Sequence, residues 1–328
     1  MLGFAIIGAG GIGKHLAGQL RQIEELPVAL RGFYDENHDA AQEAAQQLES
    51  RAYPSLDALL NDEAVQAVII ATPPFTHAPL TLQALAHGKH VFCEKPMALR
   101  LEDCDAMLRA AQQADRLLMV GHVLRLFPLF WHAKCLIDEG RIGRVLALNV
   151  RRTGYDLDLF SRGWRAAEEQ SGGLILEMNV HELDYMRFIG GEVRRVFAQG
   201  IRPLPQTRFI QHWQALLTFE TGAIGTLEAS LIDALGRYTV CIVGERGSIL
   251  HGGFGGELVL RTAEGEEEHF TAEQLNLPDP YRWELTAFAR AILEGEPLPF
   301  DGWDGRQAVA LALACLQSIH TGEPIITR

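Results

Sequence analysis

The sequence predicts an α/β protein that joins a doubly wound parallel sheet to a second domain with a mostly antiparallel sheet. Three observations predict this class. A glycine-rich turn follows an apolar strand at the N-terminus, and apolar strands then alternate with helices up to about residue 121. From residue 145 to about residue 270 the hydrophobic period shifts towards two. The 328 residues are enough for two domains, which we expect over 1–121 and 122–328.

The N-terminal turn predicts a phosphate-binding crossover. The apolar run Phe4–Ile7 leads into three spaced glycines, and Lys14–Leu20 is predicted to be helical. In a dinucleotide-binding crossover the first glycine permits the turn, the second lets the backbone approach a pyrophosphate and the third allows close helix packing. Glycines also occur in ordinary tight turns, so the motif alone leaves that alternative open. The residues of this turn that we predict to bind a cofactor are Gly8, Gly10, Gly11, Ile12 and Gly13.

An acidic residue follows the second predicted strand, Val28–Tyr34. Asp35 lies about 20 residues beyond the last glycine, where a carboxylate accepts hydrogen bonds from the adenosine ribose hydroxyls. A 2′-phosphate would meet its negative charge and that of Glu36, so the pair favours NAD over NADP. The alternative is that Asp35 only caps a helix that starts near Asp39.

Strand and helix signals continue to alternate after this acid. The predicted strands lie at 51–53, 64–71, 90–93 and 117–120, and the predicted helices at 39–49, 55–60, 76–87 and 101–114. The continuous apolar character of 64–71 is typical of a strand buried on both faces of a parallel sheet. Six strands with intervening helices therefore predict a doubly wound sheet.

Two segments follow the fourth and fifth predicted strands, where ligands bind in such a sheet. The first contains Thr72, Pro73 and His77, and the second contains Glu94 and Lys95. We predict that all five contact the cofactor, with Lys95 near the nicotinamide. The alternative for Lys95 is an ordinary solvated surface lysine.

The second domain is predicted to be a mainly antiparallel sheet with two closing helices. The helix 130–139 comes first and stops at Gly140. The predicted strands are 145–154, 193–201, 210–220, 223–232, 238–243 and 248–251, and the closing helices are 282–294 and 306–320.

A mostly apolar segment, 171–185, carries two acids and a histidine. If it is one helix, Glu177, His181 and Asp184 share an arc of about 60° and face a pocket. The alternative is a single histidine satisfied in the core. The motif of zinc proteases does not apply, because Tyr185 replaces its second histidine.

Composition excludes several classes of function. The net charge of −13 disfavours a nucleic-acid partner. The N-terminal apolar run is too short for a membrane span and lacks the charged n-region of a signal peptide. The cysteines have no CxxC spacing, so we expect reduced thiols in a cytoplasmic protein and no metal site. They are Cys93, Cys104, Cys135, Cys241 and Cys315.

Together these motifs resemble the glucose–fructose oxidoreductase/inositol dehydrogenase family (Gfo/Idh/MocA). The resemblance covers nearly the whole chain and includes GAGGIG with Asp35, ATPPFTH, CEKP, SGGLILEMNVHELD, VGERGSI and DGRQAVALALACLQSIHTGEPI. It implies a Rossmann domain followed by a substrate-binding domain with a large open sheet. One face of that sheet often forms a homodimer or homotetramer interface.

The resemblance also implies roles for individual residues. Lys95 and His181 correspond to the catalytic pair, and Glu177 takes the place of a usual aspartate. His181 would remove a hydroxyl proton, Lys95 would stabilise the alkoxide, and Glu177 or Asp184 would orient the imidazole. Leu124 departs from the arginine that inositol dehydrogenases tend to carry. The predicted substrate contacts are Arg152, Tyr155, Trp164, Arg165 and Asp184.

These features predict an NAD-dependent dehydrogenase of a sugar, cyclitol or related polyol. Hydride would move between a hydroxyl-bearing carbon and nicotinamide. One alternative is an NADP-dependent reductase of a keto-sugar or another carbonyl or imine. The other is a non-catalytic regulator that senses NAD or a sugar, against which the presence of both Lys95 and His181 argues.

Overall fold

The computed structural model describes residues 1–327 and divides the chain into two compact units. The first unit comprises residues 1–122 together with 279–306, and the second comprises residues 123–278 together with the segment from Gln307 onward. The first boundary lies one residue from the expected position. The expected second domain, 122–328, differs from the observed one because residues 279–306 return to the first unit.

The first unit contains a parallel six-stranded sheet with the strand order β3-β2-β1-β4-β5-β6. Every residue of β1 is buried, so both faces of the sheet are covered, as a doubly wound fold requires. The predicted fold class of this unit is thus confirmed. Its strands are β1 (Leu2–Ile7), β2 (Val28–Tyr34), β3 (Arg51–Ala52), β4 (Ala67–Ile70), β5 (His90–Cys93) and β6 (Leu118–Val120).

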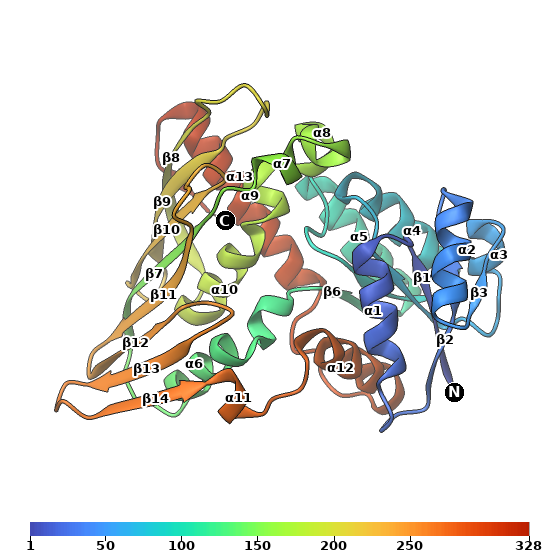
Figure 1. Ribbon diagram of the computed structural model, residues 1–328, viewed down its shortest axis with the longest axis horizontal. Coiled ribbons are helices and arrows are strands. Elements are labelled where there is room, and N and C mark those ends of the chain that lie inside the picture. Colours follow the sequence, from blue (N-terminus) through green and yellow to red (C-terminus); the bar gives the residue numbers. More distant parts are fainter. Residues whose placement is uncertain (328) are drawn as a thin grey trace. The chain divides into compact units, whose positions relative to one another are not determined.

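The helices of the first unit follow the strands in alternation (Figure 1). Ser55, at the start of the predicted helix 55–60, caps α3, and its hydroxyl accepts a hydrogen bond from the Ala58 amide at 3.1 Å. The helices are α1 (Gly11–Arg21), α2 (His38–Gln47), α3 (Leu56–Leu60), η1 (Pro74–Thr76), α4 (His77–Ala86), α5 (Leu101–Ala114) and α12 (Pro280–Glu294).

Helix α12 explains why the chain returns to the first unit. Its Phe288 is fully buried and packs edge-on against Phe4 of β1 and Phe92 of β5, with ring centroids 6.2 and 6.0 Å apart. Helical periodicity marks a buried face but does not say which sheet covers it. For this reason the helix was predicted correctly but was assigned to the second domain, whereas it belongs to the first unit.

The second unit contains a nine-stranded sheet with the order β14-β13-β12-β11-β7-β10-β9-β8-β15. The β7–β10 pair is parallel and the other pairs are antiparallel, so the prediction of a large, mostly antiparallel sheet is confirmed. Its strands are β7 (Val145–Thr153), β8 (Val193–Ile201), β9 (His212–Phe219), β10 (Ile224–Ser230), β11 (Arg237–Gly244), β12 (Gly247–His251), β13 (Glu257–Thr262), β14 (Glu267–Thr271) and β15 (Ile325–Ile326).

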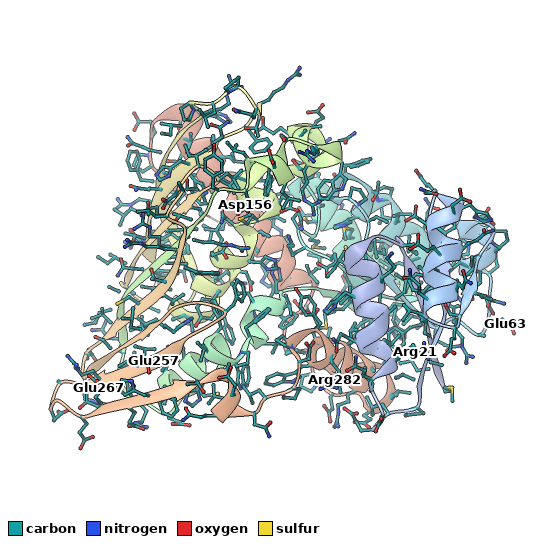
Figure 2. All side chains as sticks on the ribbon, viewed as in Figure 1. Arg21, Glu63, Asp156, Glu257, Glu267 and Arg282 are labelled. Carbon is teal, nitrogen blue, oxygen red and sulfur yellow. The ribbon has the colours of Figure 1, made fainter. Side chains whose placement is uncertain are left out.

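The β13–β14 hairpin was not predicted as two strands. Its exposed face is highly charged: Glu257 and Glu267, labelled in Figure 2, flank His269, whose ring nitrogens lie 3.0 and 2.9 Å from their carboxyl oxygens. Such charge obscures the alternation by which strands are recognised.

Helices of the second unit lie on one face of this sheet, and Figure 1 shows no helix over its other face. Ser318 of α13 accepts a hydrogen bond from the Ala198 amide of β8 at 2.9 Å, which ties that helix to the sheet. The helical segments are η2 (Val123–Leu126), α6 (Pro128–Asp138), α7 (Leu157–Phe160), η3 (Gly163–Ala166), α8 (Glu168–Ser171), α9 (Gly173–Glu177), α10 (Val180–Gly190), α11 (Ala272–Leu275) and α13 (Gly302–Thr321), of which the first residues of α13 belong to the first unit.

The prediction of one helix over 171–185 is wrong. Helix α9 ends at Glu177 and α10 begins at Val180. Asn179, between them, is fully buried; its side-chain oxygen accepts from Trp213 Nε1 at 2.8 Å and its amide donates to Glu182 at 3.0 Å. The backbone amides of Met178 and Asn179 both donate to the Leu174 carbonyl oxygen at 3.1 Å, so the regular helical bonding pattern is interrupted at this point. The single arc expected for Glu177, His181 and Asp184 therefore does not exist.

Within residues 1–327 no helix has both the length and the apolar character needed to cross a bilayer. The same residues contain no group of three or more His, Cys, Asp or Glu side chains arranged to hold a metal ion. All five cysteines are free thiols.

Candidate functional site

The glycine turn of the first unit has the geometry that its sequence predicts. Gly8 has φ = +104°, and a Cβ atom there would lie 2.5 Å from the carbonyl oxygen of Ala71. A Cβ atom on Gly13 would collide with the carbonyl oxygen of Gly8, so this position needs close approach of helix α1 to the turn. The space beside Gly10 is open, and this residue is the N-cap of α1, where no side chain caps the helix. Backbone amides at the start of α1 are thus suited to bind a pyrophosphate.

Asp35 completes this turn from the end of β2. Its carboxylate accepts hydrogen bonds from the Ala9 amide at 2.7 Å and the Asn37 amide at 2.8 Å. The cap of α2 is Asn37, which accepts from the Ala40 amide at 3.3 Å, so the alternative that Asp35 is the helix cap is wrong. Each carboxylate oxygen has a second acceptor position, which fits binding of ribose hydroxyls.

His77 links the two loops that follow β4 and β5. Its Nε2 lies 2.8 Å from the Thr72 carbonyl oxygen and its Nδ1 lies 2.8 Å from the Pro96 carbonyl oxygen. Complete burial lowers the pKa of this imidazole, while the two carbonyl groups act in the opposite direction. A neutral ring donates to only one of them. Because its side chain is fully buried, His77 holds the loops together and is not exposed to a ligand.

The segment after β5 places Glu94 beneath the turn that carries Lys95. The Lys95 amide donates to Glu94 Oε2 at 3.2 Å, and the Lys95–Pro96 peptide is cis. A Cβ atom on Gly121 would lie 3.3 Å from Glu94 Oε1, so the glycine leaves room for this nearly buried carboxyl group. Lys95 itself is partly exposed.

In the second unit a buried ion pair fixes helix α10. Arg125 of η2 donates to Asp184 through Nε at 2.7 Å and through Nη2 at 2.5 Å. The exposed fractions of their side chains are 5% and 0%. The predicted substrate contact Asp184 is therefore not exposed to a ligand, and its burial favours a positioning role. His181 lies on the same helix, one turn earlier, and is partly exposed.

Next to His181, Glu182 is the centre of a second buried network. The Glu182 carboxylate accepts hydrogen bonds from Arg152 Nη1 at 2.8 Å, from the Tyr238 hydroxyl at 2.7 Å and from the side-chain amide of Asn179. Sequence reasoning named Arg152 but missed Glu182 and Tyr238. A glutamate in an otherwise apolar segment was the available signal, but its partners are 30 and 56 positions away.

Glu177 is paired with another predicted residue. Arg165 of η3 donates from Nε to its Oε1 at 2.9 Å, and the guanidinium lies 4.2 Å from the centroid of the Trp164 ring. The structure thus brings together Glu177, which was predicted among the catalytic residues, and two of the predicted substrate contacts. Tyr155, in contrast, is 60% exposed.

A cavity of about 310 Å³ lies at the end of β7 in the same unit. It contains Arg152 and Tyr238 from the Glu182 network and Met178 from the break before α10. Asp156, labelled in Figure 2, also lines it. Polar and charged groups around a cavity of this size suit a small, hydroxyl-rich ligand.

Two protein-family models match the chain, and both agree with the fold and the site geometry described above. Residues 2–122 match the model described as "Oxidoreductase family, NAD-binding Rossmann fold", and residues 130–250 match the GFO/IDH/MocA C-terminal domain. The chain belongs to the GFO/IDH/MocA family. This is a family of NAD(P)-dependent oxidoreductases of sugars and cyclitols, and the resemblance seen in the sequence is confirmed.

Relatives within the GFO/IDH/MocA family carry different activity names. Inositol 2-dehydrogenase 2 of Saccharopolyspora erythraea is 32% identical over 98% of this chain and 94% of its own length. The 2,7-anhydro-N-acetylneuraminate hydratase of Mediterraneibacter gnavus is also 32% identical, over 90% of this chain and 80% of its own length.

Solved structures agree with the GFO/IDH/MocA fold. The UDP-N-acetylglucosamine 3-dehydrogenase from Acidithiobacillus ferrooxidans has a TM-score of 0.85 at 26% identity and covers 98% of both chains. Levoglucosan dehydrogenase in complex with NADH and L-sorbose has a TM-score of 0.91 at 23% identity, covering 100% of this chain and 99% of that one. The latter identity is low enough that the similarity establishes the fold alone.

Proposed function

We propose that this protein is an NAD-dependent oxidoreductase that moves a hydride between nicotinamide and a hydroxyl-bearing carbon of a sugar, cyclitol or related polyol. The observation that carries the proposal is the presence of a well-formed dinucleotide turn together with Lys95 after β5 and His181 on α10. The inositol 2-dehydrogenases and the 1,5-anhydro-D-fructose reductase among its relatives support this substrate class.

NAD fits the first unit because of the turn and Asp35. The open space at Gly10 and the uncapped start of α1 suit a pyrophosphate, and Asp35 suits a ribose diol. The charge of Asp35 would repel a 2′-phosphate, which supports NAD over NADP. NAD, when bound, supplies the hydride acceptor.

The chain itself supplies the proton chemistry. We assign His181 as the base that removes the hydroxyl proton and Lys95 as the cation that stabilises developing alkoxide charge.

Around the substrate, we assign contacts to Arg152, Tyr155, Trp164 and Arg165. Glu177 is assigned a positioning role through its pair with Arg165, and Asp184 a positioning role through its pair with Arg125.

Substitution of the two proposed catalytic residues tests the function. Purified protein is assayed with NAD and a panel of sugars, anhydrosugars and cyclitols. Lys95→Ala and His181→Ala are each expected to lower kcat/KM by at least about a hundredfold. The matched controls Lys134→Ala and His320→Ala change a lysine and a histidine outside the site and keep the wild-type rate. Near-normal turnover in His181→Ala would overturn its assigned role.

The assay also separates the other activities. Because hydratases occur among the relatives, products are analysed by mass spectrometry in addition to NADH absorbance. A product without net NADH indicates a redox-neutral reaction, and carbonyl reduction that requires NADPH indicates the reductase. Cofactor binding with no turnover across the panel indicates a non-catalytic regulator.

We further propose that the protein forms a homo-oligomer through the uncovered face of the nine-stranded sheet. Leu216, Ile224 and Leu250 project from this face with exposed fractions of 45%, 52% and 50%. Exposed apolar groups of this kind mark association surfaces. The variant Leu216→Glu is expected to shift the mass measured by light scattering towards the monomer, whereas an unchanged mass would contradict the proposal.

A further inference from the structure

A buried carboxyl group of the first unit has no place in the chemistry above. Glu284 lies on α12, the helix on which Figure 2 labels Arg282. Its side chain is 0% exposed, and neither of its carboxyl oxygens has a hydrogen-bond partner among residues 1–327. An ionised carboxylate in such surroundings is strongly disfavoured, so the neutral acid is favoured there.

The packing of α12 places Glu284 towards the Glu94 turn. Glu284 and Phe288 are four residues apart and share a face of the helix, and Phe288 packs on Phe92 of β5. Along the chain from β5, Phe92 and Glu94 are two residues apart, the spacing at which side chains of an extended segment share a face. The aromatic contact and the two acids thus belong to the same interface between helix and strand.

The charges that face Glu284 are negative. Burial raises the pKa of Glu284 most, and the charges of Glu94 and then of Asp279, the N-cap of α12, raise it further. The neighbouring helix α1 places His15 against the ring of Tyr281, at 4.6 Å between centroids. The Arg282 guanidinium donates to Gln22 at 3.3 Å. Neither basic group is among the charges that act on Glu284.

We propose that Glu284 is a positioning residue of the cofactor unit, held as a neutral carboxylic acid behind the Glu94–Lys95 turn. Loss of its proton would place a second negative charge beside Glu94. The Glu94 carboxylate accepts a hydrogen bond from the Lys95 amide and occupies the space beside Gly121. Repulsion between Glu94 and an ionised Glu284 would therefore loosen the turn that carries Lys95. The assignment of Lys95 to the cofactor side rests on the proposed function.

The direction of the pH effect follows from proton linkage. The folded protein holds this proton more tightly than the unfolded chain does, so its contribution to stability is complete below the carboxyl pKa of the unfolded chain. The contribution is lost as pH rises towards the higher pKa of the folded state. NADH affinity is expected to fall at higher pH, where the folded protein itself loses the proton.

The test compares Glu284→Gln with wild type, since glutamine has the shape of the neutral acid but no proton to lose. NADH affinity is measured by fluorescence and the unfolding temperature of the ligand-free protein by calorimetry, from about pH 6 to about pH 9. Wild type is expected to bind NADH about tenfold more weakly at the upper end, and Glu284→Gln to show a flat profile. The control Glu294→Gln, an exposed acid on the same helix, keeps the wild-type profile.

Two further measurements keep the test decisive. Wild type is expected to show an infrared carbonyl band of a protonated carboxyl group that is absent in Glu284→Gln. If Glu284→Gln does not fold, Glu94→Gln is used: removing the neighbouring negative charge lowers the pKa of Glu284 and shifts the wild-type pH dependence to lower pH. The proposal would be overturned if the unfolding temperature of Glu284→Gln depended on pH as that of the wild type does. It would also be overturned if the pH dependence of Glu94→Gln were not shifted.

The test distinguishes a failure of the Glu284 proposal from a failure of the proposed function. If no nicotinamide dinucleotide binds, the proposed function fails, while the unfolding temperatures and the infrared band still decide the state of Glu284. If NADH binds, but wild type and Glu284→Gln have the same NADH affinity and the same unfolding temperature at every pH, only the positioning role of Glu284 fails.

Discussion

The two units assemble their functional groups in different ways. In the first unit the cofactor turn consists of backbone groups and an acid that are near one another in sequence: Asp35 binds an amide only 26 positions away. In the second unit the central contacts join distant side chains, with 59 positions between Arg125 and Asp184. Local sequence patterns therefore describe the first site well and the second poorly.

The two units also differ in whether their buried acids are paired with a cation. The second unit pairs its buried acids, as Asp184 with Arg125 and Glu182 with Arg152. The first unit leaves Glu284 without a hydrogen bond among the residues that the structure describes. A buried acid with a cation remains charged, whereas one without a cation is neutral, so the two units are expected to respond oppositely to the loss of a carboxyl group.

The largest expected effect is in the paired unit. Asp184→Ala leaves Arg125 buried without its carboxylate and should lower the free energy of unfolding by about 3–5 kcal/mol, measured by urea denaturation. The double variant Arg125→Met, Asp184→Leu should recover most of this loss. The control Lys134→Ala removes an exposed pair with Asp138 and should cost less than about 1 kcal/mol. A loss below about 1 kcal/mol in Asp184→Ala would show that the pair does not organise this unit.

Acidification should distinguish a buried from an exposed histidine of the second unit. Burial lowers the pKa of His251 to about 4. Its contribution to stability is present above the unfolded pKa of about 6.5 and is lost as pH falls, by about 3 kcal/mol in total. Unfolding free energies measured from about pH 7 to about pH 4 should therefore decline less in His251→Leu than in wild type.

The exposed His269 provides a control of opposite sign. Hydrogen bonds to Glu257 and Glu267 raise its pKa. Its contribution is present below the unfolded pKa and is lost as pH rises through the folded value. His269→Gln should thus leave the loss on acidification as large as in wild type or larger; a smaller loss would contradict this assignment.

Two glycines of the turn are expected to affect different properties: Gly13 affects stability and Gly10 affects cofactor binding. Gly13→Ala forces a Cβ atom against the Gly8 carbonyl and should lower the unfolding free energy by about 1–3 kcal/mol. Gly10→Ala enters open space and should keep the wild-type unfolding temperature while weakening NADH binding. Calorimetry and NADH titration of both variants provide the comparison. Equal thermal stability of the two would contradict the role of Gly13 in packing.

The smallest expected effect concerns cofactor choice. Asp35→Asn removes the charge and one of the two amide contacts, and should weaken NAD binding about tenfold, or about 1.4 kcal/mol, while improving binding of NADP relative to NAD. Calorimetric titration with both cofactors measures this ratio. Asp39→Asn, on α2, is the matched control and should leave the ratio unchanged. An unchanged ratio in Asp35→Asn would remove the basis for preferring NAD.

Much of the first unit could be predicted because its signals are local. The strand Val28–Tyr34, the strand His90–Cys93 and the helix Leu101–Ala114 have the predicted bounds. Apolar runs and turn residues determine such elements within a few positions of chain. The position of Asp35 at the end of its strand follows from the same pattern.

Side-chain partners could not be predicted in this way. The helix break after Glu177 lies at Asn179, whose buried side chain bonds Trp213 and Glu182, and the local sequence did not indicate these partners. Similarly, the sequence of α12 shows a buried face but not that Phe4 and Phe92 cover it.

By itself, then, the sequence determined the parallel sheet, its glycine turn and the acid beside that turn, because steric and hydrogen-bonding limits on the backbone act over short distances. The tertiary structure decided which buried acids have cations: Asp184 meets Arg125, Glu182 meets Arg152, and Glu284 lies in the field of Glu94. The reason is physical. The energy of a buried charge depends on the groups that packing brings around it, and these come from distant parts of the chain.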